Sequence, residues 1–247
     1  MKTIKGNFGE CIIDNCLNAK GEWELCFSDT MWGKEYDGKN PQGINRKTYR
    51  PHIINYEDKF DPEFHKAWFT KFQKITKAQV VCTGMKYFNW WVTNFNPIGY
   101  HIITYNNGQG MSKTSIHSSY AIYLCFGDEF WKTHKFFRGH RHTYIPNGFL
   151  RGDEYIHPSP KPFNSWKDMI EELHVKSIVD PFGGSCPIGE VGEYLGIEWR
   201  AYEIKPEYIP DIKKRIQKGI KRHQNYKPKK NYNQNKLDSF SSEYINQ

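Results

Sequence analysis

The most informative stretch of this chain is Ser177-Ile-Val-Asp-Pro-Phe-Gly-Gly-Ser-Cys-Pro-Ile-Gly-Glu190. It begins with a short apolar run, continues through a glycine-rich turn and ends in a pattern typical of a helix. Glycine lets backbone amides approach a ligand closely. Because ligands bind at the carboxyl ends of strands in open α/β sheets, this strand, turn and helix predict a binding site at the turn.

A second strand, predicted at residues 199–204, places Glu203 at its carboxyl end. In this architecture a carboxylate at that position accepts hydrogen bonds from the two hydroxyls of a ribose. The separation between Asp180 and Glu203 is close to the roughly 20 residues that such folds use. The alternative is that Glu203 is a helix-terminal acid before Pro206, stabilised by the helix dipole.

Strand and helix patterns alternate on both sides of this stretch. The predicted strands are residues 22–27, 78–82, 101–105, 120–126, 176–179 and 199–204, and the predicted helices are 62–75, 164–173, 188–195 and 207–221, with a short helix between strands 78–82 and 101–105. This alternation predicts an α/β fold, a doubly wound Rossmann-like sheet with helices on both faces. We expect one domain over residues 1–224, a small insertion at residues 128–156 and a disordered basic tail at residues 225–247.

The composition limits the classes of function. A formal net charge of +8 and an aromatic content of 16% suit a polyanionic partner whose bases stack on rings. The six cysteines form no Cys-x-x-Cys pair and no zinc-like group with histidine, so we expect reduced thiols and no metal. No apolar run approaches the roughly 20 residues that span a bilayer, and the first residues lack a signal-peptide core, which predicts a cytoplasmic protein without a membrane partner.

Three motifs together resemble the DNA amino-methyltransferases, which transfer a methyl group from S-adenosylmethionine to adenine N6 or cytosine N4. Asp180-Pro-Phe-Gly-Gly-Ser185 and Glu203-Ile-Lys-Pro-Glu-Tyr208 resemble the cofactor half of that family, and His157-Pro-Ser-Pro-Lys-Pro162 is similar to its His-Pro-Thr-Gln-Lys-Pro signature. Their position after the catalytic segment resembles the motif order of the β group. The resemblance covers residues 157–215 and implies a methyltransferase fold with S-adenosylmethionine as cofactor.

The resemblance implies a set of cofactor-binding residues. They are Asp180, Phe182, Gly183, Gly184, Ser185, Glu203, Lys161 and Asn7. Asn7 is included because Lys5-Gly-Asn-Phe-Gly-Glu10 resembles the family's Gly-Asp-Cys stretch, which touches the cofactor adenine. The sequence departs from the family at Cys186, where a third glycine is usual. That side chain either alters the geometry of the cofactor site or is an inert buried cysteine.

The catalytic segment of the family, Asp-Pro-Pro-Tyr, corresponds to Asp29-Thr-Met-Trp32. The amino lone pair of a base is delocalised into the ring, so a carboxylate must accept its hydrogens as the nitrogen attacks. Asp29 can do this, and Trp32 would stack on an extruded base. Thr30 and Met31 replace two prolines and remove their stiffness, so activity could be reduced, redirected or lost. The alternatives are a turn aspartate at Asp29 and core packing at Trp32.

The insertion at residues 128–156 interleaves basic and aromatic side chains, which suit phosphates and unstacked bases. The candidate DNA-binding residues are Lys132, Lys135, Arg138 and Arg141. The resemblance implies double-stranded DNA with a flipped target base as the partner, and a homodimer is compatible with it. The aspartate at position 29 favours adenine N6 over cytosine N4. Such site-specific DNA methylation is typical of restriction-modification.

Two other functions stay open at this level. A catalytically silent relative would keep the fold and bind DNA or cofactor, and another enzyme would methylate RNA or a protein amide. A nicotinamide dehydrogenase is disfavoured, because the glycine turn lacks the Gly-x-Gly-x-x-Gly spacing that admits a pyrophosphate.

Overall fold

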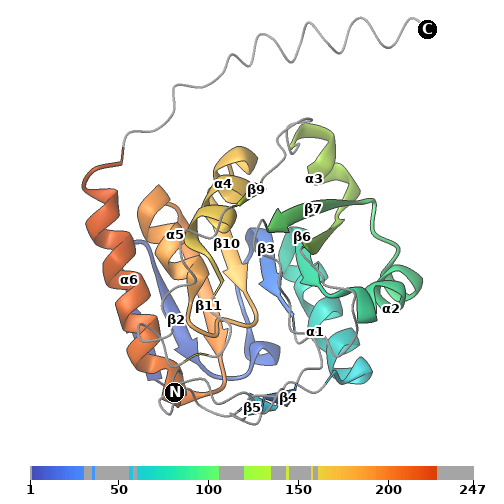
Figure 1. The fold of residues 1–247 in the computed structure, drawn as a ribbon, viewed down its shortest axis with the longest axis horizontal. Helices are drawn as coiled ribbons and strands as arrows, with labels where there is room; N and C mark the ends of the chain where they lie inside the picture. The colour runs from blue at the N-terminus through green and yellow to red at the C-terminus, as the bar shows by residue number, and fades with distance from the viewer. Residues whose placement is uncertain are drawn as a thin grey trace, which may run out of the picture.

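The computed structural model describes residues 2–30, 35–36, 56–57, 60–105, 120–134, 143–144, 157 and 161–226. A nine-stranded sheet with helices on both faces forms the centre of the molecule (Figure 1). The elements are β1 (Lys2–Lys5), β2 (Gly9–Ile13), η1 (Cys16–Asn18), β3 (Trp23–Asp29), β4 (Glu35–Tyr36), β5 (Tyr56–Glu57), α1 (Pro62–Ile75), β6 (Thr76–Thr83), α2 (Met85–Phe95), β7 (Gly99–Tyr105), β8 (Tyr120–Phe126), α3 (Asp128–Thr133), β9 (Thr143–Tyr144), α4 (Phe163–Leu173), β10 (Ser177–Asp180), α5 (Pro187–Leu195), β11 (Glu198–Glu203), η2 (Pro206–Tyr208) and α6 (Ile209–His223).

The order of strands in the sheet is β1-β2-β11-β10-β3-β6-β8-β7-β9. The central strands β2, β11, β10, β3 and β6 run parallel. β1 pairs antiparallel with β2, β8 pairs antiparallel with both β6 and β7, and β9 pairs parallel with β7. The chain passes from β3 through α1 to β6 in one direction, and from β10 through α5 to β11 in the other. The crossovers therefore diverge between β3 and β10, which is where doubly wound sheets bind their ligands.

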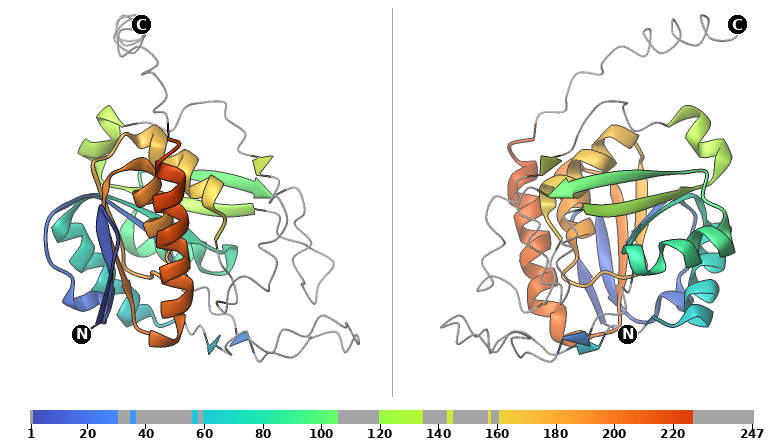
Figure 2. Two further views of the ribbon diagram at one scale, coloured as in Figure 1. Left: turned by 90° about the vertical axis from the view of Figure 1, so that its left-hand side faces the viewer. Right: turned by 45° about the vertical axis from the view of Figure 1, so that its right-hand side comes forward.

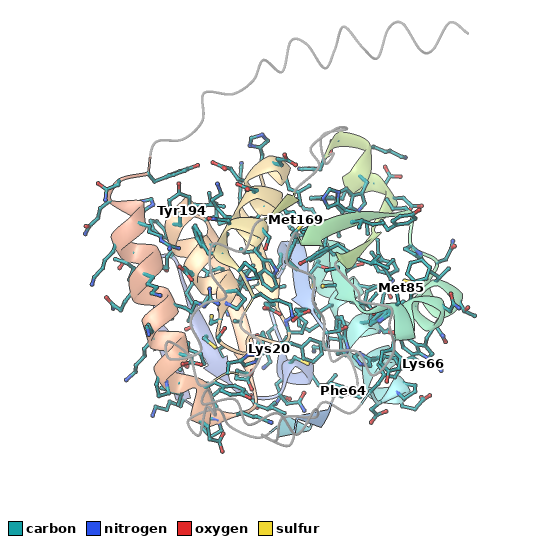
Figure 3. The ribbon with its side chains drawn as sticks, in the orientation of Figure 1. Lys20, Phe64, Lys66, Met85, Met169 and Tyr194 are labelled. Carbon is teal, nitrogen blue, oxygen red and sulfur yellow. The ribbon has the colours of Figure 1, made fainter. Side chains whose placement is uncertain are left out.

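Side chains of the central strands alternate between two cores, because neighbouring residues of a strand point to opposite faces. Leu25 and Phe27 belong to the core beneath α4, α5 and α6, whereas Cys26 belongs to the core beneath α1 and α2. Figure 2 shows α1 and α6 on opposite sides of the sheet. Met169 of α4, labelled in Figure 3, is fully buried in the first core. Burial on both faces explains the short continuous apolar runs within these strands, at residues 25–27, 80–82 and 178–179.

Helix boundaries follow from local sequence. Asp61 caps α1 by accepting hydrogen bonds from the amides of Glu63 and Phe64, and Pro62 occupies the first turn. The helix α5 also begins at a proline and ends at Gly196, whose φ of 70° is in the left-handed region that favours glycine. Local chemistry alone therefore defines the two helices that connect the central strands.

The structure confirms the predicted α/β class. Residues 62–75 and 120–126 form α1 and β8 as expected, and the predicted helix between residues 82 and 101 is α2. The sequence does not predict the hairpin β1–β2, whose strands are only four and five residues long. Nor does it predict α3, because six residues are too few to show a helical period at the start of the expected insertion. Among the described helices, none has the length and apolar character needed to cross a membrane.

The helix α5 packs closely against β11 at Gly192. A Cβ atom there would lie 2.4 Å from Cδ1 of Trp199, so we expect Gly192→Ala to lower the unfolding free energy by roughly 1–3 kcal/mol through overpacking. This loss exceeds the gain of about 1 kcal/mol in helix propensity. Urea unfolding measures the difference. Gly99→Ala is the matched control, because a Cβ atom at Gly99 meets nothing within 4 Å; equal stability of both variants would contradict the packing argument.

Candidate functional site

Three carboxylates meet where the crossovers diverge. Asp29 ends β3, Asp180 ends β10 and Glu203 ends β11. These strands are neighbours in the sheet and run parallel, so their carboxyl ends lie at one edge. The charges of both Asp29 and Glu203 act on Asp180. The structure thus brings together the predicted catalytic residue and the two predicted acidic ligands of the cofactor.

The glycine-rich turn is fastened to Glu203. Oε2 of Glu203 accepts the amide hydrogen of Gly184 at 2.7 Å, and Oε1 accepts that of Lys205 at 2.7 Å. Glu203 thus bonds both the glycine turn and Lys205, the residue that precedes η2, so it does more than stand before a helix. Burial raises the pKa of Glu203 to about 7, despite these two hydrogen bonds, which act in the opposite direction. Each oxygen retains further capacity to accept a hydrogen bond from a ligand.

Asp180 is completely buried beneath the same turn. Its Oδ1 accepts the amide hydrogen of Phe182 at 2.9 Å, whereas Oδ2 has no hydrogen-bond partner among the described residues. Burial raises the pKa of Asp180 well above its usual range, and the charges of Asp29 and Glu203 raise it further. Phe182 points to the opposite core, where its ring meets Trp68 edge to face at 5.1 Å. An unsatisfied buried carboxyl oxygen is a position at which a cationic ligand would be stabilised.

Asp29 forms an ion pair with Lys161. Nζ of Lys161 lies 2.6 Å from Oδ2 of Asp29. The two side chains are 16% and 19% exposed, so solvent and salt screen this pair less than a surface pair. Lys161, expected from the sequence to be a cofactor residue, thus contacts the candidate catalytic carboxylate. The thiol of Cys82 also interacts with Asp29, and burial followed by that negative charge raises the pKa of Cys82 well above its usual range.

Thr30 takes over part of the stiffness that a proline would supply. It is 4% exposed, and both its amide and its hydroxyl donate to the carbonyl oxygen of Cys82, at 3.3 and 3.0 Å. The turn after β3 is therefore attached to β6 at its first residue. A proline could form neither hydrogen bond. Thr30 therefore attaches the start of the turn in a way that a proline could not, while Met31 lies outside the described residues.

Cys186 stands at the left-handed position where the family has glycine, with φ of 63°. Its side chain is fully buried in the core that contains Cys11 and Ile188, below the turn. Gly189 must be small beside it, because a Cβ atom there would lie 2.7 Å from Sγ of Cys186. The structure therefore favours the inert buried cysteine over a side chain that enters the site. The six cysteines, Cys186 included, are buried free thiols.

The structure corrects the expectation for Asn7. Its backbone amide donates to Oε2 of Glu193 at 3.0 Å, in the hairpin turn between β1 and β2. The strand β2 pairs with β11 from Gly9 opposite Trp199 to Ile13 opposite Glu203. Asn7 therefore lies at the amino edge of the sheet, opposite to the carboxylates. A local motif cannot show which end of an unpredicted hairpin reaches the site.

Lys132 also lies at the amino edge. The helix α3 starts where Gly127 packs against Lys77 and Ala78 at the beginning of β6, and Nζ of Lys132 is 2.6 Å from Oε1 of Glu129. Lys132 thus lies at the opposite edge of the sheet from the candidate catalytic carboxylate of Asp29. The other predicted contacts lie outside the described residues, as do two residues of the catalytic turn. These residues are Lys135, Arg138, Arg141, Met31 and Trp32.

Sequence reasoning missed the two residues of α6 that hold the main chain of His157 and that of Lys161. The amide of His157 donates to Oδ2 of Asp211 at 2.8 Å, and Nη2 of Arg215 donates to the carbonyl oxygen of Lys161 at 2.8 Å. The ring of His157 rests on the glycine turn, since a Cβ atom at Gly184 would lie 2.9 Å from its Nε2. Burial lowers the pKa of His157 to about 3, so this ring is neutral at pH 7. Asp211 and Arg215 are four residues apart, a spacing that indicates a shared helix face.

Comparison with known proteins agrees with this geometry at the level of the fold. M1.HpyAVI in complex with SAM superposes with a TM-score of 0.50 and 15% identity, over 79% of this chain and 89% of that one. A protein of Thermus thermophilus described as a DNA modification methylase gives 0.54 and 11%, over 85% and 95%. The cytosine-N4-specific PvuII DNA methyltransferase gives 0.51 and 15%, over 89% and 92%.

These likenesses show that the chain has the Rossmann-like fold of DNA methyltransferases. No protein-family model matches the sequence, and no curated protein matches it significantly. The structural neighbours therefore confirm the predicted resemblance through the fold. They do not assign a role to any individual residue of the site.

The hydroxyl of Thr30 gives a direct test of how the turn is anchored. Thr30→Val removes the hydrogen bond to Cys82 but keeps the size of the side chain, so we expect a loss of about 0.5–1.5 kcal/mol in unfolding free energy. Thr30→Ser keeps the donor and is the matched control. Chemical denaturation of the three proteins measures the effect. A Val variant at least as stable as the parent would show that the hydroxyl does not hold this turn.

Proposed function

We propose that the protein transfers a methyl group from S-adenosylmethionine to the exocyclic amino group of a DNA base, with adenine N6 preferred over cytosine N4. The observation that carries this proposal is the carboxylate of Asp29, held by Lys161 at the end of β3, next to the glycine turn of β10. The fold shared with solved DNA methyltransferases supports it. The preference for adenine rests on the aspartate at the first position of the catalytic segment.

The edge of the sheet that carries Asp29, Asp180 and Glu203 fits a cationic cofactor. Glu203 would accept hydrogen bonds from the ribose hydroxyls, and the unsatisfied Oδ2 of Asp180 would face added positive charge. The turn Gly183-Gly184-Ser185 presents backbone close to that position, and Ser185 is buried behind it. When bound there, S-adenosylmethionine supplies an electrophilic methyl group. Binding would also relieve the mutual repulsion of the carboxylates.

Asp29 would act on the target amine and not on the cofactor. Its carboxylate would accept hydrogens from the amino group as the nitrogen becomes bonded to carbon, and the ammonium of Lys161 holds that carboxylate in one orientation. No covalent nucleophile is needed, so the rate depends on alignment of nitrogen and methyl carbon. Trp32 would support the extruded base by stacking, two residues after Thr30 fixes the start of the turn.

The proposed partner is double-stranded DNA with a flipped base. Net charge of +8 favours its binding, and Lys135, Arg138 and Arg141 remain the proposed phosphate contacts. Lys132 is omitted because of its position at the far edge of the sheet. A homodimer and a cytoplasmic location stay predictions.

Mass spectrometry of nucleosides tests the function. DNA of mixed sequence is incubated with protein and S-adenosylmethionine and then digested; we expect N6-methyladenine. N4-methylcytosine alone would overturn the base preference. Cofactor binding without any methylated nucleoside in DNA, RNA or protein substrates would favour the catalytically silent alternative.

Asp29→Ala separates catalysis from cofactor binding. We expect cofactor affinity to stay nearly unchanged and methyl transfer to fall by a factor on the order of 100 to 1,000, as for loss of one preorganised electrostatic contact. Calorimetry and single-turnover transfer measure the two quantities.

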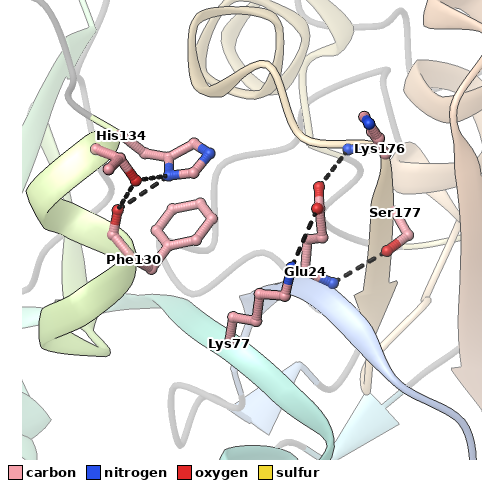
Figure 4. Close-up of polar contacts among 7 residues, drawn as sticks. Glu24, Lys77, Phe130, His134, Lys176 and Ser177 are labelled. Atoms are coloured by element: carbon pink, nitrogen blue, oxygen red, sulfur yellow. Dashed lines mark hydrogen bonds and ion pairs between the residues drawn. The ribbon is translucent and has the colours of Figure 1, made fainter.

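The matched control lies at the other end of the same strand. Glu24 pairs with Lys77 at 3.3 Å and accepts the amide hydrogen of Lys176 at 2.6 Å (Figure 4). Glu24→Ala also removes a carboxylate and its lysine pair from β3, but at the edge without the glycine turn. It should retain transfer. If both variants are fully active, Asp29 does not act on the substrate.

The raised pKa of Glu203 predicts that cofactor affinity depends on pH. Below about pH 7 the free protein holds a proton on Glu203, whereas ribose hydroxyls donate to the ionised form. Affinity should therefore increase as pH rises towards 7, by up to about tenfold per pH unit, with release of a proton, and then level off. Calorimetry between pH 5.5 and 8 in two buffers measures this. Titration of the cofactor itself affects the parent and Glu203→Gln equally. If cofactor affinity depends on pH with the same slope in both proteins, Glu203 is not the group whose titration controls binding.

A further inference from the structure

The helix α6 supports the site from outside it. Asp211 and Arg215 reach the main chain of His157 and Lys161, as described above. Among the contacts of the described residues, neither side chain is paired with Asp29. Their contacts fall on the main chain of His157 and on that of Lys161, whose ammonium pairs with Asp29.

Arg215 has contacts in three directions. Its Nη1 donates to Oε2 of Glu190 in α5 at 2.7 Å, and its Nη2 lies 2.8 Å from the carbonyl oxygen of Lys161 and 3.5 Å from Oγ of Ser185. The side chain is 1% exposed. One guanidinium therefore joins the glycine turn, the helix that follows it and the segment that carries Lys161.

Stability alone is a poor explanation for this arrangement. Removing a guanidinium and a carboxylate from water is costly, and replacing a buried ion pair by apolar side chains of similar volume is often neutral or stabilising. Glu190 moreover bonds a second arginine, Arg222, which is 44% exposed and whose guanidinium lies over the ring of Phe163. Arg215 differs from Arg222 in its deeper burial and in its hydrogen bonds to the carbonyl oxygen of Lys161 and to Ser185.

We infer that Arg215 is a positioning residue that acts through Lys161 to orient the carboxylate of Asp29. This inference rests on the proposed function. The path consists of the Arg215 guanidinium, the main chain of Lys161 and its ammonium 2.6 Å from Asp29. The contact with Ser185 ties the glycine turn to the same group, so the positions of cofactor and catalytic carboxylate share one support.

An arginine is required because its planar fork donates in two directions at once. Lysine would keep the positive charge beside Glu190 but, as a single point donor, cannot hold Glu190 and the carbonyl of Lys161 in the same geometry. Arg215→Lys is therefore the informative variant. Arg222→Gln is the matched control, because it removes a partner of Glu190 and leaves Lys161 untouched.

The test is a double-mutant cycle on methyl transfer. We expect Arg215→Lys to lower kcat by about 10- to 100-fold, the effect of a small misplacement at a reacting centre, and to change the Kd of the cofactor by less than about threefold. When Arg215→Lys is combined with Lys161→Ala, kcat should fall little below that of Lys161→Ala alone, because the link from Arg215 to Asp29 is already lost. Arg222→Gln should leave kcat unchanged. Additive losses in the cycle would overturn the inference, since a purely structural role does not depend on Lys161.

A second readout does not depend on activity. Trace acylation of lysines followed by mass spectrometry reports how well the ammonium of Lys161 is held; its reactivity should rise several-fold in Arg215→Lys and stay at the parent level in Arg222→Gln. Unchanged Lys161 reactivity in Arg215→Lys would overturn the inference even if the parent transfers no methyl group. Increased reactivity in a protein without methyl transfer would support the positioning path and reject the proposed function alone.

Discussion

The divergence of two crossovers between β3 and β10 creates the site and governs what surrounds it. One crossover places α1 on one face of the sheet and the other places α5 on the opposite face, so the carboxyl ends of β3 and β10 lie where the two crossovers part. Asp29 and Asp180 stand at those two ends. The glycine turn follows Asp180 directly, and its backbone is fastened by Glu203 from the next strand. The proposed catalytic and cofactor-binding residues are therefore neighbours because of topology, although about 150 residues separate Asp29 from Asp180 in sequence.

Electrostatics sets the chemistry of this edge. Three carboxylates are brought together with partial or complete loss of hydration, which raises the pKa values of Asp180 and Glu203 through burial before any effect of charge. The ammonium of Lys161 pairs with Asp29. The remaining acidic groups suit a ligand that brings positive charge and hydroxyl donors, whereas the chain as a whole, at +8, attracts a polyanion. Opposite charge preferences at the site and over the whole protein fit a cationic cofactor and a nucleic-acid substrate.

The backbone of the site is held by contacts that differ from those expected of the usual motif but that also fix backbone positions. Where proline would stiffen the catalytic turn, Thr30 attaches it to β6 through its amide and hydroxyl. At the position where a third glycine is usual in the proposed cofactor turn, Cys186 adopts the left-handed conformation and buries its thiol in the core. From α6, the buried side chain of Arg215 links the glycine turn to Lys161. Each device fixes a backbone position, which is what a reaction governed by alignment requires.

The α/β class, most of the strands and helices, and the glycine turn with Glu203 could be predicted from the sequence, because they depend on apolar periodicity and on turn chemistry within short segments. The sequence also identified Asp29 and Lys161 as candidate site residues, but it did not show that their side chains form an ion pair. That pairing, the position of Asn7 and Lys132 at the opposite edge, and the support by Asp211 and Arg215 emerged only from the folded chain. The physical reason is that strand order and register determine which distant residues meet, whereas periodicity reports only the face of an element on which a residue lies.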